Sequence, residues 1–174
     1  ESLLRILKNA KKRDVFTLCY IGEIAEKRGS MTIIRGLKIL GKMGFPFLFE
    51  FIGHATPSHE KELRKTAFES GVLDKIRFRG YLPNEEGLKI VAECHVGLAV
   101  LENIPNYTGS YPTKLFEYMV LGLPAIISDF PLYRKIAEEN KFVFTVSPGD
   151  PAALAEAIRK VMELGGCQKA LADN

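Results

Sequence analysis

Six short runs, each with β-branched or aromatic residues, are spaced along the chain. Three of them end in glycine, and none is longer than seven residues. Runs of this length and composition predict buried strands. The expected strands span residues 16–22, 47–53, 75–80, 96–101, 125–128 and 142–146.

The segments between these runs carry apolar residues at helical spacing, such as Ile33, Ile34, Leu37 and Leu40 in the first of them. The expected helices span residues 30–42, 58–69, 84–93, 112–121 and 132–139, and a last helix follows Asp150-Pro151. Strands that alternate with helices predict a parallel sheet with right-handed crossovers and helices on both faces. The predicted fold class is therefore α/β, a doubly wound, Rossmann-like domain with a parallel six-stranded sheet.

Three of the expected strands end in Gly22, Gly53 and Gly80, at their carboxyl ends. In a doubly wound sheet, ligands bind in the crevice beyond these ends. A residue without a Cβ permits a tight turn or a close approach of the backbone to a ligand. Two interpretations stay open, because the three glycines either mark a ligand crevice or serve ordinary turns.

The helix expected over residues 112–121 has the most informative sequence. Pro112 suits its first position, Gly122 lies just past its last turn, and Pro124 follows. A helical wheel directs one set of side chains toward the core: Leu115, Phe116, Met119 and Leu123. A second set lies well off that side: Thr113, Lys114 and Glu117. The helix is therefore expected to have a buried face and a separate chemical face.

The loop before this helix is rich in small polar residues and includes Gly109 and Ser110. Free backbone N–H groups and the positive end of the helix dipole favour an anion at a helix N-terminus. We expect the hydroxyls of Ser110 and Thr113, and the backbone N–H groups of Tyr111 and Thr113, to face phosphate oxygens. Ser110 is equally suited to cap the helix.

The composition limits the classes of protein that fit. The chain has 174 residues, 47% of them hydrophobic, which is enough for one sizeable core. Its net charge of +3 comes from 24 basic and 21 acidic residues spread along the chain, so we expect no nucleic-acid partner. Four basic residues near the start are interpreted as a solvated helix face: Lys8, Lys11, Lys12 and Arg13.

No metal site is expected from the cysteines and histidines. The cysteines are odd in number and far apart, and the histidines lack ligand spacing: Cys19, Cys94, Cys167, His54, His59 and His95. Reduced thiols favour a cytoplasmic protein. No apolar run approaches the ~20 residues of a membrane span, and no signal peptide is visible. Residues 1–14 are expected to be a linker or N-terminal helix of a longer protein, and residues 15–174 a single domain.

The segment from Gly109 to Pro124, with Pro148-Gly149-Asp150-Pro151 downstream, resembles the C-terminal domain of family 4 (group 1) glycosyltransferases of the GT-B fold. Other landmarks occur in the family's order: Gly22 and Arg28-Gly29 after the first strand, residues 51–53 after the second, and residues 76–83 at the third. The resemblance covers about residues 15–165. It implies that this domain binds the nucleotide half of an activated sugar, while a preceding Rossmann-like domain, absent from this sequence, binds the acceptor.

The resemblance assigns a role to Glu117, which matches the second glutamate of the family's Glu-x7-Glu motif and would accept hydrogen bonds from the ribose hydroxyls. A carboxylate suits two vicinal hydroxyls, because both bonds are charge-assisted. The alternative is an exposed glutamate that pairs with Lys114. The whole set of nucleotide-binding residues implied by the resemblance is Gly22, Arg28, Gly53, Tyr81, Leu82, Gly109, Ser110, Tyr111, Thr113, Lys114, Leu115 and Glu117.

The sequence departs from the family pattern at two positions. Gly109 stands where the first glutamate of the motif would contact the donor sugar, and Glu23 stands where many members carry an arginine that faces the diphosphate. Arg28 matches the usual lysine, and Lys114 is the candidate replacement cation. Tyr81 and Leu82 occupy the segment that frames the nucleobase. For the Tyr81 side chain, the alternative is that it covers the sheet edge.

The resemblance implies transfer of a glycosyl group from a UDP- or GDP-sugar to a glycan or lipid-linked acceptor. It also implies retention of anomeric configuration, with no cofactor and no obligatory metal, in polysaccharide or cell-envelope synthesis at the inner face of a membrane. No catalytic residue is certain in this segment. Two alternatives stay open: half of a sugar-nucleotide epimerase, and a non-enzymatic nucleotide-binding or interaction domain. A nicotinamide-binding domain does not fit, since no Gly-x-Gly-x-x-Gly follows the first strand.

Overall fold

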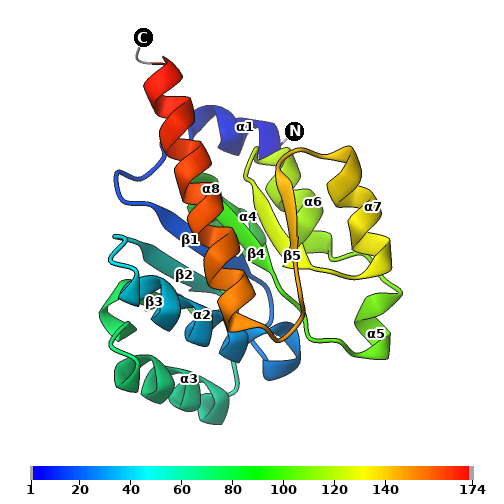
Figure 1. Cartoon of the computed structure of the whole chain (residues 1–174). Helices are drawn as coiled ribbons and strands as arrows, with labels where there is room; N and C mark the ends of the chain where they lie inside the picture. The colour runs from blue at the N-terminus through cyan, green and yellow to red at the C-terminus, as the bar shows by residue number, and fades with distance from the viewer. Residues whose placement is uncertain (1, 173–174) are drawn as a thin grey trace.

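Six parallel strands form a single sheet in the order β3-β2-β1-β4-β5-β6 (Figure 1). The computed structural model describes residues 2–172, with side-chain surroundings for residues 3–165. The strands are β1 (Thr17–Ile21), β2 (Leu48–Ile52), β3 (Ile76–Phe78), β4 (Val96–Ala99), β5 (Ala125–Ser128) and β6 (Val143–Val146). Every predicted strand is present, and the α/β fold class is confirmed.

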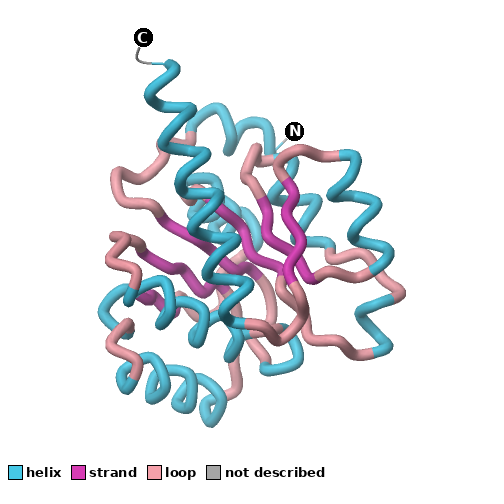
Figure 2. The backbone as a smooth tube through the Cα atoms, viewed as in Figure 1, coloured by secondary structure: helices cyan, strands magenta, loops and turns pink. Residues whose placement is uncertain are grey.

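Helices cover both faces of the sheet (Figure 2). One face packs against α2 (Ser30–Lys42), α3 (Pro57–Glu69) and α8 (Pro151–Ala172), and the other against α1 (Ser2–Asn9), α4 (Asn84–Glu93), α6 (Thr113–Val120) and α7 (Pro131–Glu139). Three short helical segments lie in connections: η1 (Glu26–Arg28), η2 (Leu73–Lys75) and α5 (Pro105–Thr108). The α5 turn was not predicted from the sequence.

Side chains of the central strands alternate between two cores because successive residues of a strand point to opposite faces. In β2, Phe49 and Phe51 lie on the α2 side, with their ring centroids 4.6 Å apart, whereas Ile52 lies on the α4 side. All three are buried. The two cores fix the sheet from both faces and leave its carboxyl edge for the loops that follow the strands.

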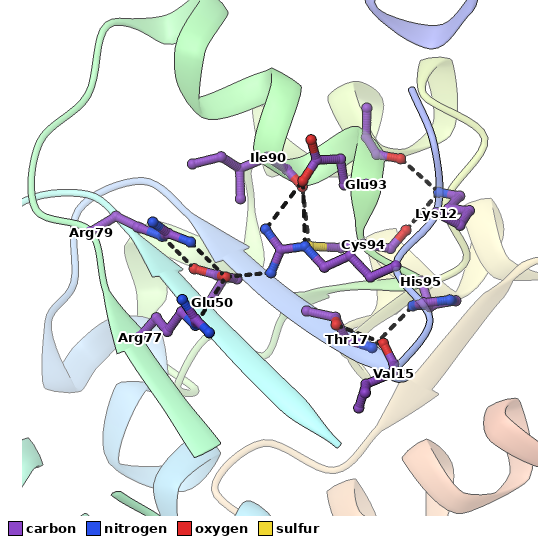
Figure 3. A network of polar contacts seen from close by, with 12 residues as sticks. Lys12, Val15, Thr17, Glu50, Arg77, Arg79, Ile90, Glu93, Cys94 and His95 are labelled. Carbon is purple, nitrogen blue, oxygen red and sulfur yellow. Dashed lines mark hydrogen bonds and ion pairs between the residues drawn. The ribbon is translucent and has the colours of Figure 1, made fainter. Parts of the chain in front are cut away.

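Among the described residues, one charged side chain of the sheet is buried. Glu50 of β2 is fully buried, and its carboxylate accepts hydrogen bonds from Arg13 Nη1 at 2.5 Å and from Arg79 Nε at 2.7 Å (Figure 3). Burial raises the pKa of Glu50, but the hydrogen bonds from Arg79 and Arg13 outweigh it and hold the pKa below its ordinary value. A buried carboxylate needs such partners, so this network links the N-terminal segment to the sheet.

The basic residues near the start of the chain differ from the predicted solvated helix face. Lys12 Nζ donates to the backbone oxygens of Ala92 at 3.0 Å and Cys94 at 2.6 Å, at the end of α4 (Figure 3). Arg13 joins the Glu50 network. These two cations are held by α4 and β2, because carbonyls at a helix C-terminus and a buried carboxylate both attract positive charge. Residues 11–13 follow α1 instead of lying on it, so the interpretation of a helix face is wrong for Lys12 and Arg13, although Lys12 is exposed.

Two smaller findings complete the fold. None of the helices in the described part of the chain combines the length and the apolar character that a membrane crossing requires. Cys19 and Cys94 are buried free thiols, whereas the side chain of Cys167 lies outside the described residues.

Candidate functional site

The strand order reverses between β1 and β4, which are neighbours in the sheet although β2 and β3 separate them in the chain. The chain leaves β1 toward β2, on one side of this point, and it leaves β4 toward β5, on the other side. In doubly wound sheets, the loops diverge at such a switch point and leave a crevice beyond the carboxyl ends of the strands. The loop after β1 and the helix α6 after β4 meet at this point of the carboxyl edge, where such a crevice is expected.

The three predicted glycines lie side by side at this edge. Gly22 N donates to Ile52 O and Gly53 N donates to Gly80 O, each at 2.9 Å, so the ladder continues past the strands. A Cβ on Gly53 would lie 1.7 Å from Gly22 O, so the approach of two backbones accounts for that glycine. A Cβ on Gly22 would lie 3.4 Å from Lys114 Cε. Gly22 therefore leaves room for a cationic side chain.

Tyr118 of α6 holds that helix against the switch point. Its hydroxyl donates to Leu98 O of β4 at 3.1 Å and accepts from Ile21 N of β1 at 3.3 Å. The ring lies over Gly97, where a Cβ would be 2.5 Å from ring carbons. Tyr118 thus joins α6 to both strands at the crevice. It was missed in the sequence, although a glycine inside a strand is a signal of a close approach.

Lys114 is the buried cation of the site. The residue is 6% exposed, and its Nζ lies 4.8 Å from the centroid of the Tyr20 ring. Burial, and then the nearby charge of Arg28, lower the pKa of Lys114 to about 8. Among the residues whose side chains are described, Lys114 forms no ion pair. A partly desolvated ammonium that has no ion-pair partner is costly, and an anion beside it would compensate the cost.

The faces of α6 differ from the helical-wheel prediction. Lys114 and Leu115 are buried together with Tyr118, whereas Phe116 is 47% exposed. The helix is rotated because Tyr118 must reach β1 and β4, and the lysine stem is long enough to be buried while its ammonium reaches the crevice. The helix also begins at Thr113, since Pro112 has an extended ψ of 118°, and it ends at Val120. The predicted boundaries were one residue too long at each end.

Glu117 lies one turn beyond Lys114 and is half-buried. Burial raises the pKa of its carboxyl group, and the nearby Lys114 charge opposes that rise. Over the described side chains, no Glu117–Lys114 ion pair within 4.0 Å occurs, so the alternative of a surface pair is wrong. The carboxylate remains available to an external hydrogen-bond donor.

Arg28 reaches the same edge from η1. Its Nε donates to Glu23 Oε2 at 3.0 Å, and its guanidinium lies 5.7 Å from the centroid of the Tyr107 ring. The Glu23 side chain is 53% exposed. The charge of Arg28 is therefore paired with a carboxylate from the loop after β1.

The loop before α6 differs from the predicted capping arrangement. Ser110 Oγ donates to Asn106 O at 3.0 Å, so it closes the α5 turn instead of capping α6. Gly109, Tyr111 and Thr113 are exposed, and the Tyr111 ring centroid lies 6.0 Å from that of Phe116. Within residues 2–172, no side chain caps the N-terminus of α6. Its first backbone N–H groups are left for solvent or for a ligand.

Three further predicted site residues have clear positions. The Leu115 side chain is fully buried, and its backbone N donates to Pro112 O at 3.1 Å, so its side chain faces the core, and a ligand contact of Leu115 stays a prediction. Leu82 packs against the α4-side core. Tyr81 is 78% exposed, so the alternative that it covers the sheet edge is wrong. The structure thus brings Gly22, Gly53, Arg28, Lys114 and Glu117 together.

Metal-ligating residues do not cluster at this edge. In the part of the chain whose side chains are described, no group of three or more His, Cys, Asp or Glu side chains is arranged to hold a metal ion. The charges that face the crevice are those of Lys114, Arg28, Glu117 and Glu23.

The model of the family described as glycosyl transferases group 1 matches residues 5–174. The chain belongs to this family. Its match to the amylovoran biosynthesis glycosyltransferase AmsK of Erwinia amylovora is 24% identical over 165 residues, 89% of this chain and 39% of AmsK. The chain therefore spans about two fifths of that group 1 relative.

Solved structures share the fold of this chain. HepE of Anabaena, solved in complex with UDP, has a TM-score of 0.73 at 17% identity, over 86% of this chain and 40% of HepE. The C-terminal domain of LpcC from Francisella tularensis, a glycosyl transferase group 1 family protein, also has a TM-score of 0.73 at 17% identity, over 90% of this chain and 78% of that domain. The domain described here thus shares its fold with the C-terminal domain of LpcC.

Proposed function

We propose that this group 1 chain is the nucleotide-sugar-binding half of a glycosyltransferase. Its donor would be a UDP- or GDP-sugar. The observation that carries the proposal is Lys114, whose stem is buried beside Gly22 at the switch point of the sheet and whose ammonium forms no ion pair among the described side chains. Support comes from HepE, a protein of the same fold solved with UDP, and from family membership, which favours a transferase over the epimerase and non-enzymatic alternatives.

In the proposed complex, the diphosphate lies between the N-terminus of α6 and the loop after β1. Lys114, the uncapped N–H groups of α6 and, after release from Glu23, Arg28 all present positive charge to phosphate oxygens. Glu117, one turn further along the helix, accepts hydrogen bonds from the ribose. Gly53, Gly80 and the backbone of residues 81–82 follow along the same edge and would line the nucleobase end.

The same groups suggest how glycosyl transfer is assisted. As the bond between the sugar and the diphosphate breaks, negative charge grows on the leaving diphosphate, and fixed cations and helix N–H groups stabilise it. We assign these residues no general base. A preceding domain would bind the glycan or lipid-linked acceptor and complete the crevice, and the whole enzyme would work in the cytoplasm, with transfer proposed to retain the anomeric configuration.

The role of Glu117 is tested by a substitution that keeps the shape of its side chain and removes the charge. We expect Glu117→Gln to weaken binding of UDP or GDP about tenfold, because a neutral amide replaces charge-assisted acceptance of ribose hydroxyls. Isothermal titration calorimetry measures the affinity. The matched ligand is the 2′-deoxyribonucleoside diphosphate, for which the loss should be much smaller. Equal losses for the two ligands would remove the ribose assignment.

The Arg28–Glu23 pair gives a prediction in which a substitution strengthens nucleotide binding instead of weakening it. Glu23→Gln is expected to tighten nucleoside diphosphate binding about threefold, since it frees Arg28 and removes a negative charge from the diphosphate end of the site. The control is Glu26→Gln, which removes an exposed carboxylate from η1. If both variants bind the nucleotide equally tightly, Glu23 does not compete with the ligand for Arg28.

A further inference from the structure

Tyr20, the fourth residue of β1, lies directly beneath the proposed diphosphate site. The residue is 1% exposed, and the face of its ring lies 4.8 Å from Lys114 Nζ. Its hydroxyl donates to Glu23 O at 2.6 Å. One side chain therefore contacts the cation from α6 and also the loop that leads to Arg28.

We propose that Tyr20 is a positioning residue that holds the charged Lys114 side chain at the crevice through the face of its ring. The proposal rests on the function proposed above. Gly22, two residues after Tyr20 and just past the end of β1, leaves the space that the lysine stem occupies, since a Cβ there would lie 3.4 Å from Cε and 3.5 Å from Nζ. Strand β1 and the residue that follows it thus supply the aromatic surface and the space for Lys114.

The surroundings of Lys114 explain why an aromatic face is needed. A cation is attracted to the negative face of an aromatic ring, most strongly where water is excluded. The charged groups that face Lys114 are Arg28 of η1, which repels the ammonium, and Glu23 and Glu117, neither of which forms an ion pair with it among the described residues. The Tyr20 ring therefore supplies the close contact that favours the charged form without occupying the anion-binding side of the ammonium.

The hydroxyl of Tyr20 has a separate role. Burial raises the pKa of Tyr20, so the hydroxyl stays protonated and donates to Glu23 O. This bond fixes the loop whose side chain, Glu23, holds Arg28 at 3.0 Å. Removing the hydroxyl should loosen the loop, while the ring beneath Lys114 stays in place. The two roles are separable by substitution.

The test is a pH titration of the 13Cε resonance of Lys114 in the chain without ligand, assigned with Lys114→Arg. We expect Tyr20→Leu to move the midpoint to lower pH by about one unit, which corresponds to a tenfold change in the protonation equilibrium. Tyr20→Phe, which keeps the ring, should titrate like the unmodified chain. Phe51→Leu is the matched control, since this buried neighbour has its ring 6.2 Å from that of Tyr20 and should leave the midpoint in place.

Binding of UDP or GDP to the same variants separates this role from the proposed function. We expect Tyr20→Leu to bind about tenfold more weakly at pH 7.5, and Tyr20→Phe to lose less than about threefold. If Lys114 titrates with the same midpoint in Tyr20→Leu and in Phe51→Leu, the role of Tyr20 is overturned, even if nucleotides bind. A midpoint that moves only in Tyr20→Leu, in a chain that binds no nucleoside diphosphate, would overturn the proposed function and leave the contact with Lys114 supported.

Discussion

Lys114→Met is expected to weaken the binding of UDP or GDP about 100-fold at pH 7. Methionine fills the space of the lysine stem without its charge, so the packing of α6 is kept. The loss corresponds to about 2.7 kcal/mol, within the range for charge-assisted hydrogen bonds from a partly desolvated cation to phosphate oxygens. Calorimetry of the 174-residue chain measures it. Lys38→Met, on the exposed face of α2, is the control and should bind like the unmodified chain.

The pH dependence of binding gives this prediction a second readout. Because the pKa of Lys114 is lowered to about 8, its ammonium is charged below that pH and loses its proton above it. A terminal phosphate has its second ionisation near pH 6, so the ligand charge is constant above pH 7. Nucleotide affinity should therefore fall as the pH rises from 7 to 9. Lys114→Met should abolish this fall, and a variant that keeps it would show that another group titrates.

The second large effect concerns stability. We expect Glu50→Ala to lower the free energy of unfolding by about 3 kcal/mol, because it leaves Arg13 and Arg79 without their carboxylate at the sheet. This is the low end for a broken buried pair, since both arginines are partly exposed. Chemical denaturation at pH 7 measures the change. Glu85→Ala is the control, because its partners Arg5 and Lys89 are exposed and its effect should stay under about 1 kcal/mol.

The Glu50 effect also depends on pH. The pKa of Glu50 is lower in the folded chain than its ordinary value of about 4.3. A carboxyl group of this kind stabilises the fold above that ordinary value, and the contribution is lost as the pH falls through the folded-state pKa. The difference in stability between the unmodified chain and Glu50→Ala should therefore be constant from pH 7 to pH 5 and shrink below about pH 4.3. A difference that is unchanged at pH 3 would contradict the role of the network.

The strands were predictable because buried parallel strands read as short apolar runs bounded by glycine and polar residues. All six expected ranges contain an observed strand, and the expected range 125–128 matches β5 exactly in length. The three strand-end glycines also lie where expected, at one edge. Local composition carries this information, since the four central strands β1, β2, β4 and β5 bury side chains on both faces.

The orientation of α6 was not predictable from its own sequence. A helical wheel treats lysine as polar, whereas the structure buries the Lys114 stem against Tyr20 and Gly22, which come from a strand far away in the chain. The strand order, the hydrogen bonds of Tyr118 and the pairing of Arg28 with Glu23 likewise depend on which segments meet. Tertiary contacts of this kind override local pattern.

The most direct test of the proposed site is an NMR titration of the isotopically labelled chain with UDP, GDP and NAD. The account predicts saturable shifts with at least one nucleoside diphosphate, centred on the amides of Gly22, Thr113 and Lys114 and lost in Lys114→Met. NAD should produce no saturable shifts at these amides. A folded chain that shows no saturable shift with either diphosphate, or shifts centred at the amino ends of the strands, would contradict a nucleotide-sugar site at the N-terminus of α6.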